Sequence, residues 1–247
     1  MSSPNAPAAE AGRFLTAQWR TLVMLNWEVD PALLRPLVPR GTELDAWQGK
    51  TFVSAVGFLF LDTRLFGIPV PFHRDFEEVN LRFYVRREGP EGWRRGVCFV
   101  REIVPRIAIA TIARWVYNEA YVAVPMRHRV DVATGCGSAE YGWRRDGRWE
   151  SLRASFTGAP QPLEAGSEAE FITEHYWGYT AQRDGGTIEY RVEHPSWRVW
   201  RADEAALAAD VAALYGPRFA APLAAPPSSA FVADGSPVVV RRPVRIA

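Results

Sequence analysis

The chain has 247 residues, a formal net charge of +1, and 48% hydrophobic and 13% aromatic side chains. This length and apolar content allow a substantial core, and β-rich domains often reach this size as one unit. The near-neutral charge gives no bulk attraction to nucleic acid or to anionic membranes, so we expect neither as a partner. No apolar run is long enough for a membrane span, and the first residues lack the features of a signal peptide. We therefore expect a cytoplasmic protein.

No linker or internal repeat divides the chain. We predict a disordered N-terminal tail over residues 1–14 and a single domain over residues 15–247. The two cysteines, Cys98 and Cys136, do not form a CxxC pair. We expect Cys98 to be buried in a strand as a small hydrophobic side chain and Cys136 to lie in a loop. The sequence neither requires nor excludes a disulfide between them.

Residues 18–29 have the composition of a strand. Asp30 followed by Pro31 predicts the start of a short helix, with Asp as N-cap and Pro in the first turn. Residues 51–65 are apolar on both alternating faces, which indicates a central strand that is buried on both sides.

The next strand, residues 76–86, has one polar and one apolar face, because side chains alternate along a strand. The polar face carries Phe76, Glu78, Asn80, Arg82 and Tyr84, and the apolar face carries Glu77, Val79, Leu81, Phe83 and Val85. The apolar face is a good core surface. The polar face is either a solvated outer surface or the wall of an interior that holds a polar ligand.

Residues 107–117 are apolar nearly all round, with Arg114 as the only charge, and this predicts a buried helix. A buried guanidinium keeps its proton and needs an acceptor, for which Glu78 and Glu102 are the nearest carboxylates. Arg114 is then either half of a structural ion pair or a ligand contact. The Pro-rich segment before the polar strand, residues 66–74, is a candidate lid, and its His73 is a candidate ligand contact by position alone.

The second half of the chain predicts mainly strands. A strand starts at Tyr121, and a hairpin turns at Asp146-Gly147. Ser167 and Glu170 fit a capping box that opens a short helix through about His175. Two strands then turn at Gly185-Gly186.

The last part of the chain predicts one helix and one hairpin. Leu207, Val211 and Leu214 form an apolar stripe on an Ala-rich helix that begins near Asp203. A final hairpin is expected to turn at Gly235.

Several segments resemble one family. They are WRTLVMLNWEVDP, FEEVNLRFYV, GVCFV, EFITEHYWGYT and VEHPSWRVW, and the similarity runs from about Trp19 to Ile246. This sequence resembles the DUF2071 (YqjF-like) family of uncharacterised bacterial proteins. The resemblance implies a mainly β, α+β acetoacetate decarboxylase-like fold: an antiparallel β-barrel or sheet with a buried helix and a few short peripheral helices. It also implies a homo-oligomer.

True acetoacetate decarboxylases form a Schiff base with a lysine on the strand after the buried helix. By resemblance this position falls near Tyr121, while Arg114 matches the arginine of the motif and Glu78 the active-site glutamate. The chain has a single lysine, Lys50, in a polar turn. Nothing near it suggests the burial or neighbouring cation that would leave its amine unprotonated, so we predict no Schiff-base catalysis.

The histidines and cysteines have no metal-ligand spacing, and no Gly-rich phosphate loop is present, so we predict no metal and no cofactor. The candidate site residues are Glu78 as an acid/base, Tyr121 as a hydrogen-bond donor, and Asn80, Arg82, Arg114, His73 and His175 as ligand contacts. His194 is a further candidate for the same cavity. The set favours binding of a small carboxylic or keto acid. The alternatives are a lysine-independent lyase, hydratase or isomerase that uses Glu78, and a structural protein whose aromatic side chains fill the interior.

Overall fold

The computed structural model describes residues 12–69, 74–105 and 121–247. The predicted buried helix over residues 107–117, with Arg114, lies outside the described residues, as does His73. Both cysteines are free thiols, Cys98 buried and Cys136 exposed. The described part of the chain is built mainly from strands with a few short helices, as predicted.

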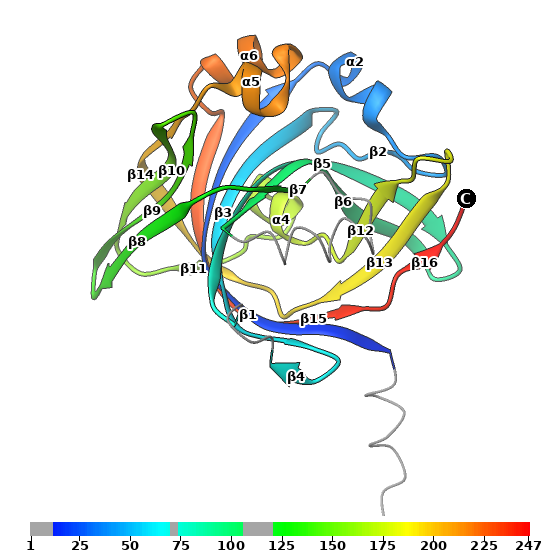
Figure 1. Cartoon of the computed structure of the whole chain (residues 1–247), viewed down its shortest axis with the longest axis horizontal. Coiled ribbons are helices and arrows are strands. Elements are labelled where there is room, and N and C mark those ends of the chain that lie inside the picture. The colour runs from blue at the N-terminus through cyan, green and yellow to red at the C-terminus, as the bar shows by residue number, and fades with distance from the viewer. Residues whose placement is uncertain (1–11, 70–73, 106–120) are drawn as a thin grey trace, which may run out of the picture.

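A closed circuit of strands, which we call the ring, forms the centre of the molecule (Figure 1). Each strand pairs with the next, and pairing of the last with the first closes the circuit. The β6–β12 pair is parallel and the other pairs are antiparallel. In order, the ring contains β15 (Ser229–Arg241), β1 (Arg13–Val29), β3 (Thr51–Leu65), β5 (Phe76–Gly89), β6 (Gly92–Val104), β12 (Trp177–Ala181) and β13 (Thr187–Glu193).

A second layer covers part of the outer side of the ring. It consists of β14 (Arg198–Ala208), β10 (Arg148–Thr157), β9 (Cys136–Arg145) and β8 (Met126–Ala133), which continue in this order from β15. Tyr141 and Trp143 of this layer share one apolar cluster with Leu81 and Phe83 of β5. Gly57 of β3 permits the close approach, because a Cβ there would lie 2.7 Å from the Tyr141 ring.

Strand β5 is therefore buried on both faces. Val79, Leu81 and Phe83 pack in the cluster between the layers, as the sequence predicts. Phe76 and Tyr84, on the other face, belong to a second cluster inside the ring. The polar face of β5 consequently points into the ring and not into solvent.

Short elements complete the fold: α2, α5 and α6 lie together at one side of the molecule, and α4 lies within the ring, where Phe171 packs with Tyr84 (Figure 1). Asp30 caps α2 as predicted, since its carboxylate accepts from the Ala32 N–H. Ser167 caps α4, and the Glu170 carboxylate reaches back to the Gly166 N–H. The remaining bounds are α2 (Pro31–Leu34), a 3₁₀ turn (Arg35–Leu37), β2 (Glu43–Leu44), β4 (Ile68–Pro69), β7 (Tyr121–Ala123), β11 (Gln161–Pro162), α4 (Glu168–Thr173), α5 (Val211–Tyr215), α6 (Pro217–Ala224) and β16 (Val244–Arg245).

The predicted helix from Asp203 to Leu214 is wrong in its first half. Leu207 lies in β14, opposite Leu152 of β10. The small Ala side chains are good helix formers, but strand pairing in the second layer outweighs this local preference. The helix begins only after Asp210, whose carboxylate accepts from the Ala213 N–H. A further helix, α6, follows it over Pro217–Ala224.

The predicted hairpin at Gly235 is also wrong, because β15 passes through this residue without turning. Gly235 has φ 82°, and a Cβ there would lie 2.1 Å from the Trp19 carbonyl oxygen of β1. The glycine marks close contact between two strands and not a chain reversal. In addition, β1 begins at Arg13, inside the predicted tail.

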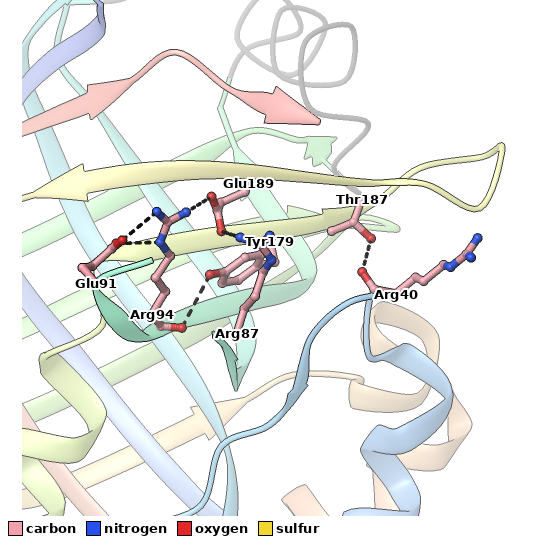
Figure 2. Close-up of polar contacts among 7 residues, drawn as sticks. All are labelled: Arg40, Arg87, Glu91, Arg94, Tyr179, Thr187 and Glu189. Carbon is pink, nitrogen blue, oxygen red and sulfur yellow. Dashed lines mark hydrogen bonds and ion pairs between the residues drawn. The ribbon is translucent and has the colours of Figure 1, made fainter. Parts of the chain in front are cut away.

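One ion-pair cluster joins β13 to the β5–β6 hairpin (Figure 2). The Glu189 carboxylate, 5% exposed, accepts from Arg94 at 2.5 Å and from Arg87 at 3.1 Å. Arg94 also pairs with Glu91, which is 56% exposed. The cluster thus ties strands on either side of β12, and Glu189 is its most buried member.

We expect Glu189→Gln to lower the free energy of unfolding by about 2–4 kcal/mol, between the values for exposed and fully buried pairs. The loss follows because two arginines remain near a neutral side chain. Urea unfolding followed by circular dichroism measures it. The matched control is Glu91→Gln, which removes the exposed carboxylate of the same cluster and should change little. Equal losses in the two variants would contradict this assignment.

Candidate functional site

The ring encloses a cavity of about 150 Å³, which we call the inner cavity. Its walls come from β1, β3, β5, β6, β7, β12, β13, β15 and the segment around α4. Of the candidate site residues that the structure describes, all line it: Glu78, Asn80, Arg82, Tyr121 and His175. Glu102 and His194 line it as well. Arg114 and His73 lie outside the described residues, so the site is described without these two side chains.

Alternation along β5 places its polar side chains together on the cavity wall. Glu78 is 3% and Asn80 is 2% exposed. The Asn80 amide donates to Glu78 Oε1 at 3.0 Å, which fixes the orientation of both groups. Asn80 Oδ1 is buried and accepts no hydrogen bond from any described residue. It is therefore available to a donor on a ligand.

Arg82 is buried, and its partners among the described residues are neutral. Its Nη2 donates to the Ile172 carbonyl at 3.1 Å, and its Nε lies 3.4 Å from the Tyr84 hydroxyl. Within the described ranges, no carboxylate lies within 4 Å of its guanidinium. A guanidinium cannot lose its proton, so a positive charge remains at the cavity wall.

A chain of hydrogen bonds holds Tyr84 in place under Arg82. Ser54 donates to Asn26 Oδ1 at 2.6 Å, and its Oγ lies 2.6 Å from the Tyr84 hydroxyl. Because the single Ser54 proton goes to Asn26, Tyr84 must donate to Ser54. The Tyr84 oxygen then accepts from Arg82. Each donation in this direction polarises the next, which strengthens the chain.

His175 enters the cavity from the residues after α4. It packs against Tyr84 and Phe171, with ring centroids 4.6 Å and 5.2 Å away. Burial lowers the pKa of His175 to about 4, and a nearby Asp45 only partly offsets this effect. The ring is therefore neutral at neutral pH. Its Nε2 lies 3.4 Å from Asp45 Oδ2, but neither ring nitrogen makes an aligned hydrogen bond with a described residue.

Asp45 lies next to the His175 ring and is itself bound by Arg95. Arg95 donates to Asp45 Oδ2 at 2.7 Å. Burial raises the pKa of Asp45, but the neighbouring His175 and the hydrogen bond from Arg95 outweigh it, and the pKa lies below its ordinary value. An ionised Asp45 favours the His175 tautomer with its proton on Nε2, which leaves Nδ1 as an acceptor.

His194 lies on a second side of the cavity, stacked on Trp197 at 4.2 Å. Its Nδ1 lies 2.9 Å from the Pro195 carbonyl, which can only accept, so Nδ1 carries the proton. Burial lowers the pKa of His194, and Arg82 adds to the effect. Both cavity histidines thus contribute hydrogen-bonding groups without a charge.

Tyr121 and Lys50 differ in position. Tyr121 begins β7, lies opposite Glu102 in the parallel β6–β7 pair, and lines the cavity. Lys50 does not line it. The Lys50 ammonium is half exposed and bonds to Glu28 at 2.8 Å. This hydrogen bond raises the pKa of Lys50, the opposite of what an imine-forming amine needs.

Sequence reasoning did not single out Asp45 and Arg95. They lie in different segments, and only the fold brings them to His175. Among the described residues, no group of three or more His, Cys, Asp or Glu side chains could hold a metal ion. No helix in the described ranges is long and apolar enough to cross a membrane.

The chain has the acetoacetate decarboxylase-like fold, as two solved structures show. The structure superposes on the acetoacetate decarboxylase of Legionella pneumophila with a TM-score of 0.64 and 15% identity, covering 100% of this chain and 92% of that one. For the enduracididine biosynthesis enzyme MppR complexed with pyruvate, the TM-score is 0.67 at 15% identity, covering 100% and 96%.

The chain belongs to the DUF2071 family, described as an uncharacterized conserved protein, whose model matches residues 16–237. It is 31% identical over 193 residues to the uncharacterized protein YqjF of Bacillus subtilis (strain 168), covering 75% of this chain and 74% of that protein. The family resemblance seen in the sequence is confirmed. The homo-oligomer and the cytoplasmic location stay predictions.

We expect the free energy of unfolding to fall as the pH decreases from 6.5 to about 4. In this range His175 is protonated in the unfolded chain but stays neutral in the folded protein, where burial lowers its pKa to about 4. The slope per histidine reaches about 1.4 kcal/mol per pH unit. His175→Gln should reduce this slope, measured by urea unfolding at several pH values. His128→Gln, which removes a half-exposed histidine outside the cavity, is the control. An unchanged slope in His175→Gln would refute the assignment.

Proposed function

We propose that this protein binds a small carboxylic or keto acid in the inner cavity, with Arg82 as the group that holds the carboxylate. The observation that carries the proposal is the buried Arg82 guanidinium, whose described acceptors are a carbonyl, a hydroxyl and a thioether, all neutral. A buried charge is costly unless an opposite charge accompanies it. A ligand carboxylate supplies that charge and can bind the planar guanidinium through two hydrogen bonds.

The surroundings of Arg82 support an anionic ligand. His175 and His194 are neutral, so they offer hydrogen bonds without competing for the anion as cations. The cavity walls are mainly apolar, and an apolar environment strengthens the attraction between opposite charges. Asn80 Oδ1, two residues from Arg82 on the same face, would accept from a hydroxyl, an enol or a water molecule beside the carboxylate.

The solved neighbours and the single lysine support the same class of ligand. MppR has been solved with pyruvate, a keto acid, and with the condensation product of pyruvate and imidazole 4-carboxaldehyde. In the present chain, Lys50 is outside the cavity and paired with Glu28. We therefore propose binding without a Schiff base.

We expect Arg82→Gln to weaken pyruvate binding at least tenfold, because a charge-assisted hydrogen bond contributes about 1.5–3 kcal/mol. Isothermal titration calorimetry measures the affinity, and circular dichroism checks the fold. Arg82→Lys keeps the charge but loses the planar fork, so it should bind with intermediate affinity. Arg153→Gln, an exposed arginine of β10, is the matched control. Pyruvate affinity that is the same in Arg82→Gln and in the native protein would contradict the proposal.

Glu78 favours a second candidate function, that of a lysine-independent lyase, hydratase or isomerase on small oxo acids. Its carboxylate is buried on the cavity wall, with Oε1 held by Asn80 at 3.0 Å. A positioned carboxylate within reach of a substrate proton can act as a general base or acid. Tyr121, at the position that resembles that of the Schiff-base lysine, would serve as a hydrogen-bond donor.

Glu78→Gln separates binding from catalysis, since the amide keeps the size of the carboxylate and its oxygen can still accept from Asn80, but it cannot take up a proton. If the protein is an enzyme, turnover should fall by a factor of about 10²–10⁴, while ligand affinity changes little. Proton NMR of oxo acids incubated with protein in D₂O detects exchange, hydration or cleavage. An active native protein whose Glu78→Gln variant is equally active would exclude Glu78 as the acid/base.

A further inference from the structure

The inner cavity has two chemically different ends. One end holds Arg82 with His175, close to α4. The other end is aromatic: Phe60 of β3 stacks on Phe76 of β5, with ring centroids 4.6 Å apart and planes 10° from parallel. The register pairs Phe60 with Phe76 and Ser54 with Arg82, so six residues of β5 separate the two ends. At about 3.4 Å per residue this corresponds to roughly 20 Å between the two Cα atoms. The Arg82 side chain shortens the gap, because its Nη2 lies 3.9 Å from Sδ of Met24, which pairs with Val56, the residue opposite Asn80.

The aromatic end continues across β1 and β13. The Trp19 ring lies 5.7 Å from Phe60 and 6.3 Å from Trp197, and all three line the cavity. Val192 of β13 lines it as well and packs in the small cluster beside Trp19. These side chains form a hydrophobic surface without a charge, which suits an apolar or aromatic group.

A three-carbon acid is too small to use both ends. If its carboxylate lies on Arg82, its methyl group cannot reach the Phe60–Phe76 stack. The cavity volume of about 150 Å³ corresponds to on the order of ten water-sized positions. That space is larger than a molecule such as pyruvate and matches an acid with a ring attached.

We propose that the ligand is an amphipathic acid, with its carboxylate on Arg82 and an aromatic or branched apolar body directed toward Trp19, Phe60 and Phe76. The inference rests on the proposed function, because it assumes that Arg82 holds a carboxylate. It adds the substrate class: an aryl- or alkyl-substituted acid and not a three-carbon one. Binding then combines a charge-assisted contact at one end with burial of apolar surface at the other.

The test compares phenylpyruvate, pyruvate and the neutral ketone phenylacetone by isothermal titration calorimetry on the native full chain. Phenylpyruvate should bind at least tenfold more tightly than pyruvate, since the ring removes additional apolar area from water. Phenylacetone, which lacks the carboxylate, should bind at least tenfold more weakly than phenylpyruvate.

Val192→Phe supplies a variant that fills the aromatic end. It should weaken phenylpyruvate binding at least tenfold and leave pyruvate binding unchanged. Val132→Phe is the matched control, because Val132 lies on β8 away from the cavity and is 49% exposed. Should Val192→Phe fail to fold, the comparison of ligands on the native chain decides alone.

The outcomes distinguish this inference from the function on which it rests. Equal affinity for pyruvate and phenylpyruvate would overturn the amphipathic ligand and keep acid binding. Binding of phenylacetone as tight as that of phenylpyruvate would overturn both, as would the absence of binding by either acid. Loss of pyruvate and phenylpyruvate affinity together in Val192→Phe would also overturn the two-ended cavity.

Discussion

Burial of β5 on both faces is the constraint on which the candidate site depends. The apolar face packs between the two layers, with Leu81 and Phe83 against Tyr141 and Trp143. Because side chains alternate strictly along a strand, this packing forces the opposite face into the ring. Polar groups then enter an interior that would otherwise be apolar. A shift of the register by one residue would exchange the two faces and abolish both the core and the site.

The second layer is therefore part of the site even though it does not line it. It covers the outer side of β3 and β5 and fixes the face that each strand presents inward. Residues Glu78 and Arg82 are oriented by packing on the far side of their own strand. Substitutions in the β9–β10 hairpin are thus expected to affect the cavity through their packing against β3 and β5, and not through direct contact with a ligand.

Much of the strand pattern could be predicted from the sequence, because it depends on local alternation. The strand over residues 51–65, the alternation in β5 and the Asp146-Gly147 turn are all present. Two errors arose where tertiary contacts outweigh local preference. The Ala-rich segment before Asp210 pairs as a strand with β10, and Gly235 lies within a strand because β1 approaches it closely.

The candidate site was predictable only in part. The alternating row of β5 carries a local signal, whereas the position of Tyr121 comes from the family resemblance; Glu78, Asn80, Arg82 and Tyr121 line the cavity. The contact of His175 with Asp45 and Arg95 has no local sequence signal, because the three residues come from segments about 50 residues or more apart in the chain. Such contacts between distant segments form when the ring closes. Periodic patterns in the sequence do not predict them.

The hydrogen bonds of Arg82 have a consequence for the energetics of the empty protein. Its described acceptors, the Ile172 carbonyl, the Tyr84 hydroxyl and the Met24 thioether, are neutral groups and not counterions. Folding therefore brings a cation out of water while only dipoles solvate it in return, and part of the lost hydration free energy is not recovered. If an anion binds there as proposed, it restores that deficit without displacing a carboxylate of the described residues. Occupancy and resistance to unfolding are then thermodynamically linked, so that the folded state gains stability as the logarithm of the free anion concentration.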